Sequence, residues 1–154
     1  AKALGMEVWA FDPFVPTEKM EAEGVKVPAT LEELYANCDY ISLHIPANEK
    51  TKGSINYELL SKMPKGGCLV NTARKEVIDE AGMEKLLAER TDLKYVTDIA
   101  PANQAALEQF APRFFATPKK QGAETAEANM NAGLAAARQI VGFIERGETK
   151  FKVN

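Results

Sequence analysis

Short apolar runs alternate with segments of helical periodicity along most of the chain. The runs at 40–45 and 68–73 are mainly apolar and rich in strand-forming residues, which is typical of strands buried in a parallel sheet. Further runs predict strands at 6–11, 95–99 and 114–116.

Helices are expected between these strands, where apolar residues recur every three or four positions. Thr30-Leu31-Glu32-Glu33 is a capping box that predicts a helix start, and Gly24 predicts a left-handed helix stop. Asp79 is expected to cap another helix. The predicted helices cover residues 17–23, 31–37, 56–63, 80–90 and 124–146. The last is the longest, and its expected buried stripe is Met130, Leu134, Ala137, Val141 and Ile144.

Strands that alternate with helices indicate right-handed βαβ crossovers. The sequence therefore predicts an α/β fold with a doubly wound parallel sheet.

The composition of the chain argues against a nucleic acid or a membrane as binding partner. The 154 residues carry a net charge of −3 with both signs interspersed, and no basic stripe or apolar run of membrane-spanning length occurs. We therefore expect neither a nucleic acid nor a membrane as partner. Cys38 and Cys68 are too few for a disulfide framework, and no signal-peptide pattern is found, so a reducing cytoplasm is the predicted location.

Polar residues follow the predicted strands, at the edge where open α/β sheets bind ligands. Arg74 ends an apolar strand, and its planar guanidinium suits a carboxylate better than lysine would. A solvated surface charge is the alternative. The polar set at the strand ends is Asp12, His44, Thr72, Arg74, Asp98, Lys119 and Lys120.

Asp12 follows a strand at the position where a dinucleotide-binding fold places its ribose-binding acid. A carboxylate there accepts hydrogen bonds from ribose hydroxyls and repels a 2′-phosphate, which favours NAD over NADP. The alternative is a turn cap before Pro13.

Three segments together carry a family resemblance: Leu43-His44-Ile45-Pro46, Val70-Asn71-Thr72-Ala73-Arg74 and Gly122-Ala123-Glu124-Thr125-Ala126-Glu127-Ala128. They resemble signatures of NAD-dependent D-2-hydroxyacid dehydrogenases, and the resemblance covers essentially the whole chain. It implies a Rossmann-like NAD-binding domain, NAD as cofactor, and hydride transfer with a D-2-hydroxy acid, expected to be phosphorylated. It also implies a homodimer.

The resemblance assigns roles to individual residues. Arg74 would hold the substrate carboxylate and its 2-oxygen, and Asp98 would receive the nicotinamide carboxamide. His44 and Pro46 would line the cofactor cleft together with the pair Thr72-Ala73. For His44, the only histidine, a purely structural role is the favoured alternative.

The chain departs from the family at the general base. Most members carry a glutamate where Asn103 stands and a histidine after the Thr-Pro pair, and both are absent here. Lysine is the substitute, with Lys120 favoured over Lys119. Burial and positive neighbours would lower a lysine pKa, and loss of the carboxylate removes a partner that would raise it. Alternatively, both lysines lie on the surface or bind phosphate.

The family's Gly-rich turn is expected about 20 residues before the ribose acid. Ala1 lies only 11 residues before Asp12. We therefore expect the first strand, its glycines and a substrate domain to be missing. Residues 1–123 would be a partial NAD-binding domain, and 124–154 a helix and tail that lead back to the substrate domain. The specific 2-hydroxy acid stays open (glyoxylate or D-lactate are alternatives), as does a non-catalytic NAD-sensing protein.

Overall fold

The structure is a computed structural model that describes residues 1–118 and 125–152. It divides the chain into two compact units, Ala1–Pro118 and Lys119–Asn154. The domain boundary predicted after residue 123 falls outside the described residues.

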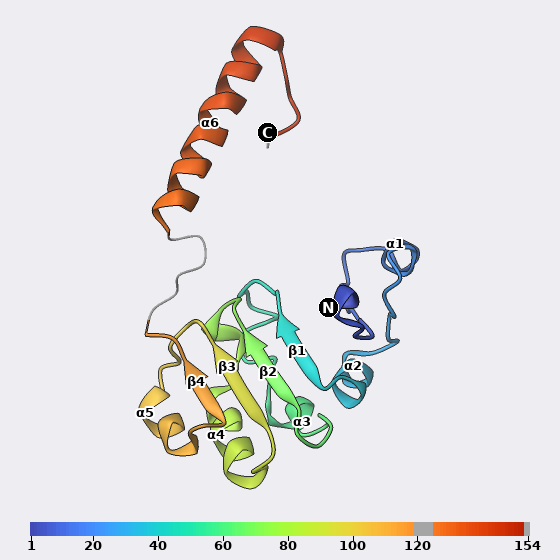
Figure 1. Cartoon of the computed structure of the whole chain (residues 1–154), viewed down its shortest axis with the longest axis vertical. Coiled ribbons are helices and arrows are strands. Elements are labelled where there is room, and N and C mark those ends of the chain that lie inside the picture. Colours follow the sequence, from blue (N-terminus) through green and yellow to red (C-terminus); the bar gives the residue numbers. More distant parts are fainter. Residues whose placement is uncertain (119–124, 153–154) are drawn as a thin grey trace. The chain divides into compact units, whose positions relative to one another are not determined.

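The first unit is built on one parallel sheet of four strands (Figure 1). The strands are β1 (Tyr40–Leu43), β2 (Cys68–Asn71), β3 (Lys94–Thr97) and β4 (Phe114–Ala116), and they lie in chain order. Their last residues are level, because Leu43 pairs with Asn71, Asn71 with Thr97, and Thr97 with Ala116. The predicted parallel α/β fold is confirmed; β1, β2 and β3 are shorter than the runs that predicted them, and β4 matches its predicted range.

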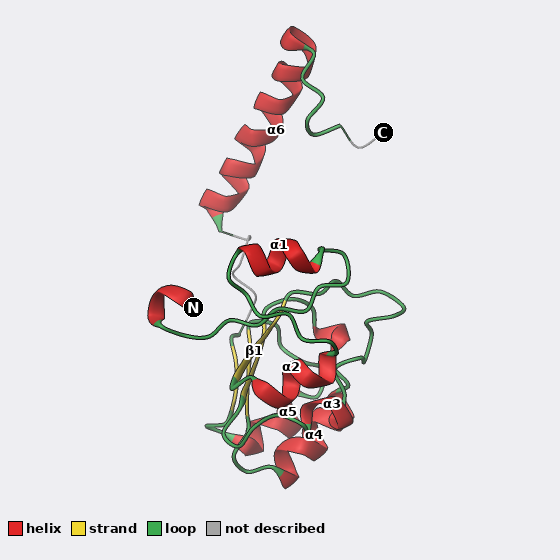
Figure 2. Ribbon diagram, turned by 90° about the vertical axis from the view of Figure 1, so that its right-hand side faces the viewer, coloured by secondary structure: helices red, strands yellow, loops and turns green. Residues whose placement is uncertain are grey.

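Helices connect the strands and cover one face of the sheet. The helices of this unit are α1 (Thr17–Ala22), α2 (Leu31–Asn37), α3 (Tyr57–Leu60), α4 (Glu80–Glu89) and α5 (Gln104–Leu107), with short 3₁₀ turns at Lys2–Leu4, Lys75–Val77 and Glu108–Phe110. Helices α2, α3 and α4 lie on the same side of the strands (Figure 2).

The hydrophobic core fills the space between this helical layer and the sheet. Alternate strand residues, such as Ile41, Leu69 and Tyr95, point into it and are at most 4% exposed. On the opposite face of the sheet, Tyr40 and Phe115 are exposed. The outer edge of β1 has no strand partner among the described residues.

Helix starts follow the local signals in the sequence. Thr30 Oγ1 accepts a hydrogen bond from the Glu33 amide, and Glu33 Oε2 accepts one from the Ala29 amide, so the predicted capping box forms. Asn56 Oδ1 caps α3 in the same way through the Leu59 amide. Asp79 stands at the N-cap of α4 as predicted, but its side chain makes no capping hydrogen bond.

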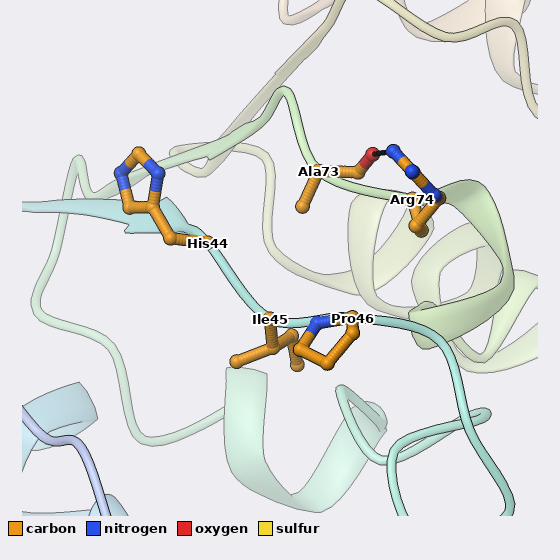
Figure 3. A pocket seen from close by; sticks show the side chains of 5 residues that line it. All are labelled: His44, Ile45, Pro46, Ala73 and Arg74. Atoms are coloured by element: carbon orange, nitrogen blue, oxygen red, sulfur yellow. Dashed lines mark hydrogen bonds between the residues drawn. The ribbon is translucent and has the colours of Figure 1, made fainter. Parts of the chain in front are cut away.

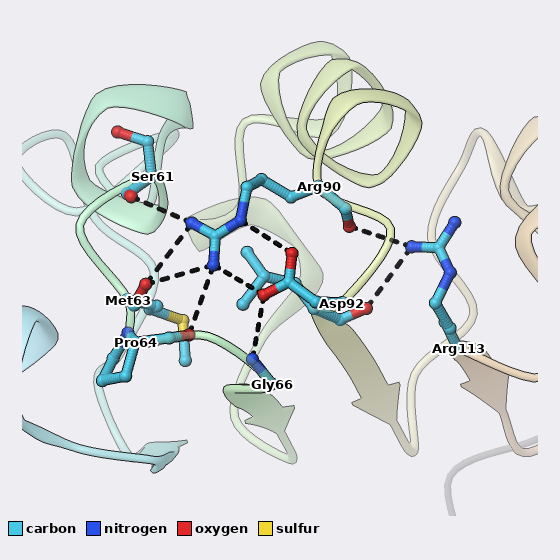
Figure 4. Close-up of polar contacts among 8 residues, drawn as sticks. Ser61, Met63, Pro64, Gly66, Arg90, Asp92 and Arg113 are labelled. Atoms are coloured by element: carbon cyan, nitrogen blue, oxygen red, sulfur yellow. Dashed lines mark hydrogen bonds and ion pairs between the residues drawn. The ribbon is translucent and has the colours of Figure 1, made fainter.

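Near the edge of the sheet where the strands begin, Arg90 and Arg113 donate hydrogen bonds to carbonyls at and beyond the helix ends (Figure 4). The Arg90 guanidinium forms a two-pronged ion pair with Asp92, at 2.9 and 2.7 Å, and also donates to the carbonyl of Met63. The Arg90 hydrogen bonds, with help from the Gly66 amide, hold the pKa of the Asp92 carboxyl well below its usual range. Arg113 donates to the Leu87 carbonyl near the end of α4. These contacts satisfy carbonyls that a helix end leaves without partners.

The strand predicted at 6–11 is wrong in its extent. Only Trp9 bridges to Lys26, through hydrogen bonds from the Lys26 amide to the Val8 carbonyl and from the Ala10 amide to the Lys26 carbonyl. A regular strand needs a hydrogen-bonding neighbour along its length. Among the residues that the structure describes, this segment has such a neighbour only around Lys26.

The second unit contains α6 (Ala126–Arg146), which begins two residues after the start predicted at 124 and ends at Arg146 as predicted. Its predicted buried stripe is wrong, because Met130, Leu134 and Ile144 are 61%, 48% and 74% exposed. Among the described residues of this unit, the helix has only the short segment after Gly147 to pack against, and these residues leave its apolar face uncovered. Across the described part of the chain, no helix is both long enough and apolar enough to span a bilayer.

Candidate active site at the carboxyl edge of the sheet

All four strands end at the same edge of the sheet, and the predicted site residues follow them. His44 comes directly after β1 and Asp98 directly after β3, while Arg74 lies three residues beyond β2. Since the strand ends are level, residues distant in sequence are brought to one edge, which is where open α/β sheets bind ligands.

An open pocket of about 350 Å³ lies between the segments that follow β1 and β2 (Figure 3). It is lined by His44, Ile45, Pro46, Ala73 and Arg74. Four of the nine predicted site residues therefore surround one pocket. Apolar walls with one cation suit a ligand that has a flat apolar part and a negative charge.

The turn that places Arg74 is held by the buried side chain of Asn71. Its Oδ1 accepts a hydrogen bond from the Ala73 amide and its Nδ2 donates to the Arg74 carbonyl, both at 3.0 Å. The Asn71 side chain thus closes a tight turn and takes the place of backbone pairing beyond the end of β2.

Thr97 supports the same turn from the neighbouring strand. Its hydroxyl donates to the Asn71 carbonyl at 2.8 Å and accepts from the Ile99 amide at 3.1 Å, and the residue is 2% exposed. Sequence reasoning gave no role to Asn71 or Thr97. The available signal was a polar residue at the last position of each of two buried strands, where an apolar residue is the norm.

Arg74 is exposed, and its Nη1 donates to the Ala73 carbonyl at 2.9 Å. Since a guanidinium carries five N–H donors, Arg74 keeps most of its donors for a ligand in the pocket. Thr72 precedes it on the same turn and is exposed, but it is not among the residues that line the pocket.

The His44 ring is held by its own strand. Ser42 lies in β1 and His44 directly follows this strand, and Ser42 Oγ lies 3.0 Å from His44 Nε2. This contact holds the ring beside the end of β1, and the role of His44 in the site stays a prediction.

Asp98 carries an oxygen that lacks a partner. Its Oδ1 is buried and accepts no hydrogen bond from the described residues. A buried acceptor without a donor is costly, so the site fits a ligand that supplies an N–H. A primary carboxamide, as on the nicotinamide of NAD, offers that group.

The Asp12 carboxylate, predicted to bind the cofactor ribose, caps a turn in the structure. Its Oδ1 accepts a hydrogen bond from the Phe14 amide at 2.8 Å, which is the turn-capping alternative seen in the sequence. The residue is exposed and is not among those that line the pocket. The ribose role therefore stays a prediction.

Lys119 and Lys120 lie outside the described residues, so their predicted role as the base stays a prediction too. Among residues 1–118 and 125–152, no group of three or more potential ligands could hold a metal ion.

A parallel sheet with its polar site at the carboxyl edge defines an α/β nucleotide-binding domain. Residues 1–119 match the family described as D-isomer specific 2-hydroxyacid dehydrogenase, NAD binding domain. The chain belongs to this family, which also confirms the expected cofactor, NAD.

Relatives with known names agree. The D-3-phosphoglycerate dehydrogenase of Methanocaldococcus jannaschii is 35% identical over 96% of this chain and 28% of its own length. The hydroxypyruvate reductase of Thermotoga maritima is 35% identical over 91% of this chain and 46% of its own length. An NAD⁺-bound 3-phosphoglycerate dehydrogenase structure from Entamoeba histolytica is 48% identical, with a TM-score of 0.83, and covers 99% of this chain and 48% of its own. The chain thus spans about a quarter to a half of these relatives.

Proposed function

We propose that this chain is the NAD-binding part of an oxidoreductase that interconverts 3-phospho-D-glycerate and 3-phosphohydroxypyruvate, the entry step to serine. The observation that carries the proposal is the Asn71 turn, which places the Arg74 guanidinium at the mouth of an apolar pocket. The similarity to two phosphoglycerate dehydrogenases supports this choice of substrate.

In this proposal each residue has a defined task. Arg74 binds the substrate carboxylate and 2-oxygen through paired N–H donors, which fixes the orientation of the reacting carbon. Asp98 accepts from the cofactor carboxamide, and Asp12 accepts from the adenosine ribose. The walls at Pro46 and Ala73 exclude water from one side of the ring. NAD, when bound, supplies the hydride acceptor.

The proton of the substrate hydroxyl needs a base, and we assign it to Lys120, with Lys119 as the alternative. A neutral lysine amine takes the proton in the oxidation direction and returns it in reduction. An ordinary lysine is protonated at neutral pH, so the proposal requires a pKa lowered by its surroundings.

The test is turnover of the full-length gene product, followed as NADH formed from NAD. We expect activity with 3-phospho-D-glycerate that exceeds activity with D-lactate or glycerate. Arg74→Lys keeps the positive charge but loses the paired N–H donors that bind a carboxylate at two points. The KM for 3-phospho-D-glycerate should therefore rise by about 10- to 100-fold. The KD for NAD should stay unchanged in that variant, and a parallel rise would contradict the assignment of Arg74 to the substrate.

The lysine assignment is tested with Lys119→Ala, Lys120→Ala and the double variant. We expect the loss of rate to follow Lys120 and to be largest in kcat. Full activity in the double variant would remove lysine from the mechanism.

A different D-2-hydroxy acid is the second candidate. It is favoured by the hydroxypyruvate reductase of Thermotoga maritima, which has the same identity to this chain as the archaeal phosphoglycerate dehydrogenase. A higher kcat/KM with hydroxypyruvate or glyoxylate than with the phosphorylated acid would select it.

A non-catalytic NAD sensor is the third candidate, favoured by Asn103 in place of the usual glutamate. NAD binding without turnover on any 2-hydroxy acid would select it. We also propose a homodimer in the cytoplasm, to be tested by sedimentation of the full-length protein and by cell fractionation.

A further inference from the structure

The hydroxyl of Thr97 contacts both segments that carry the candidate ligand-binding groups. Thr97 is the last residue of β3 and is 2% exposed. Its Oγ1 lies 2.8 Å from the Asn71 carbonyl oxygen and 3.0 Å from the Ile99 carbonyl oxygen, and it accepts from the Ile99 amide at 3.1 Å. Because a hydroxyl has a single hydrogen, it donates to one carbonyl at a time, and the shorter distance favours Asn71. One side chain therefore joins the end of β2 to the loop that leaves β3.

The Asn71 carbonyl is the junction of these two segments. It accepts a second hydrogen bond, from the Asp98 amide at 3.3 Å. The Asn71 side chain in turn holds the tight turn that carries Arg74. The amides of Asp98 and Ile99 are both bonded to this junction, one directly and one through the Thr97 hydroxyl. The backbone on each side of the Asp98 side chain is thus fixed relative to the Arg74 turn.

The two segments present groups for different ligands. Asp98 has a buried oxygen that accepts no hydrogen bond from the described residues and suits a cofactor N–H, whereas the exposed Arg74 guanidinium suits a carboxylate. Hydride transfer requires the two reacting carbons to be held about 3–3.5 Å apart. A shift of the Asp98 segment relative to the Arg74 turn would misalign them, so the group that bridges the two segments controls this distance.

We propose that Thr97 is a positioning residue, whose hydroxyl couples cofactor binding at Asp98 to substrate carboxylate binding at Arg74. This inference rests on the roles of those two residues in the function proposed above. Breaking the contact between the Thr97 hydroxyl and the Ile99 amide loosens both segments at once. A ligand that holds one segment therefore makes the other segment easier to hold, and the coupling is equal in both directions.

The experiment separates the two halves of the Thr97 side chain in the full-length protein. Thr97→Val replaces the hydroxyl by a methyl group, and the matched control Thr97→Ser keeps the hydroxyl and removes the methyl group. Oxalate is the probe, because it presents a carboxylate beside a second oxygen, as a 2-oxo acid does. Calorimetry gives the dissociation constant of oxalate without NADH and with saturating NADH. Their ratio is the coupling factor, from which a uniform loss of affinity in a variant cancels.

In the parent protein we expect NADH to strengthen oxalate binding by about 5- to 100-fold. The coupling factor should fall at least about fivefold in Thr97→Val and stay within about twofold of the parent in Thr97→Ser. A second measurement needs no variant, since oxalate alone should slow hydrogen exchange of the Ile99 amide in the parent by at least about threefold. The Glu33 amide, at the cap of α2, is the control and should not respond to oxalate.

The outcomes separate this inference from the proposed function. The role of the Thr97 hydroxyl is overturned by a parent without coupling, by unchanged coupling in Thr97→Val, by an equal loss in Thr97→Ser, or by an Ile99 amide that does not respond to oxalate. In an enzyme that oxidises 3-phospho-D-glycerate, each of these results leaves the proposed function in place. Coupling that depends on the hydroxyl, in a protein that turns over no 2-hydroxy acid, supports the Thr97 contact and removes the proposed activity.

Discussion

Replacing Asn71 by leucine tests the turn on which the candidate site depends. Leucine has the same number of side-chain heavy atoms as asparagine and the same branching at Cγ, so Asn71→Leu opens no cavity at this fully buried position. It removes two hydrogen bonds of 3.0 Å, one donated by the Ala73 amide and one accepted by the Arg74 carbonyl. Loss of a buried hydrogen bond costs about 1–3 kcal/mol. Because Ala73 is half-buried and Arg74 exposed, water recovers part of this loss, and we expect a total of about 2 kcal/mol.

The assay is hydrogen–deuterium exchange of the full-length protein at the peptide that contains Ala73. A local loss of about 2 kcal/mol corresponds to roughly 30-fold faster exchange of the Ala73 amide. The control is Asn56→Ala, which removes a helix cap at α3 and should leave exchange at Ala73 unchanged. Exchange in Asn71→Leu within about threefold of the parent would refute the reasoning, because the side chain would then contribute little to holding the turn.

Three further predictions concern stability. The pKa of Asp92 is lowered by Arg90 and the Gly66 amide, so its stabilisation is present above the unfolded pKa of about 4 and is lost as pH falls toward the lower folded value. Asp92→Asn should therefore flatten the decline of the urea midpoint in acid, and an unchanged slope would contradict the ion pair. Thr30→Ala removes the capping hydrogen bond of α2 and should cost about 1 kcal/mol in urea unfolding, with no loss expected for Thr30→Ser. Leu60→Ala, at a fully buried position, should cost about 2–5 kcal/mol in the same assay, and a cost near that of a surface change would place Leu60 outside the core.

Sequence reasoning worked where the signal is local. The Thr30 capping box and the helix stop at Gly24 each depend on a few neighbouring residues, and both are found in the structure. The parallel sheet was also predictable, because apolar runs separated by helical segments leave few other topologies. The same order of strands brings residues at their carboxyl ends to one edge, so the pocket at His44 and Arg74 could be located in advance.

Sequence reasoning failed where an element depends on what lies beside it. The apolar run at 6–11 has strand character, but a strand forms only opposite a partner, and the described residues pair with it only around Lys26. The stripe on α6, which includes Met130, predicts a buried face, but periodicity does not identify the surface that covers it. Thr97 was overlooked because its hydroxyl bonds to the Asn71 carbonyl on the neighbouring strand, a contact that no single segment reveals.

The outer edge of β1, which includes Ile41, affects how readily this polypeptide aggregates. No strand within residues 1–118 and 125–152 pairs with this edge, and a row of unpaired amides and carbonyls is a template on which extended segments of other molecules can add. Expression of residues 1–154 alone should therefore favour insoluble aggregates at high concentration. Coverage of that row by a further segment of polypeptide would be the most direct route to soluble material.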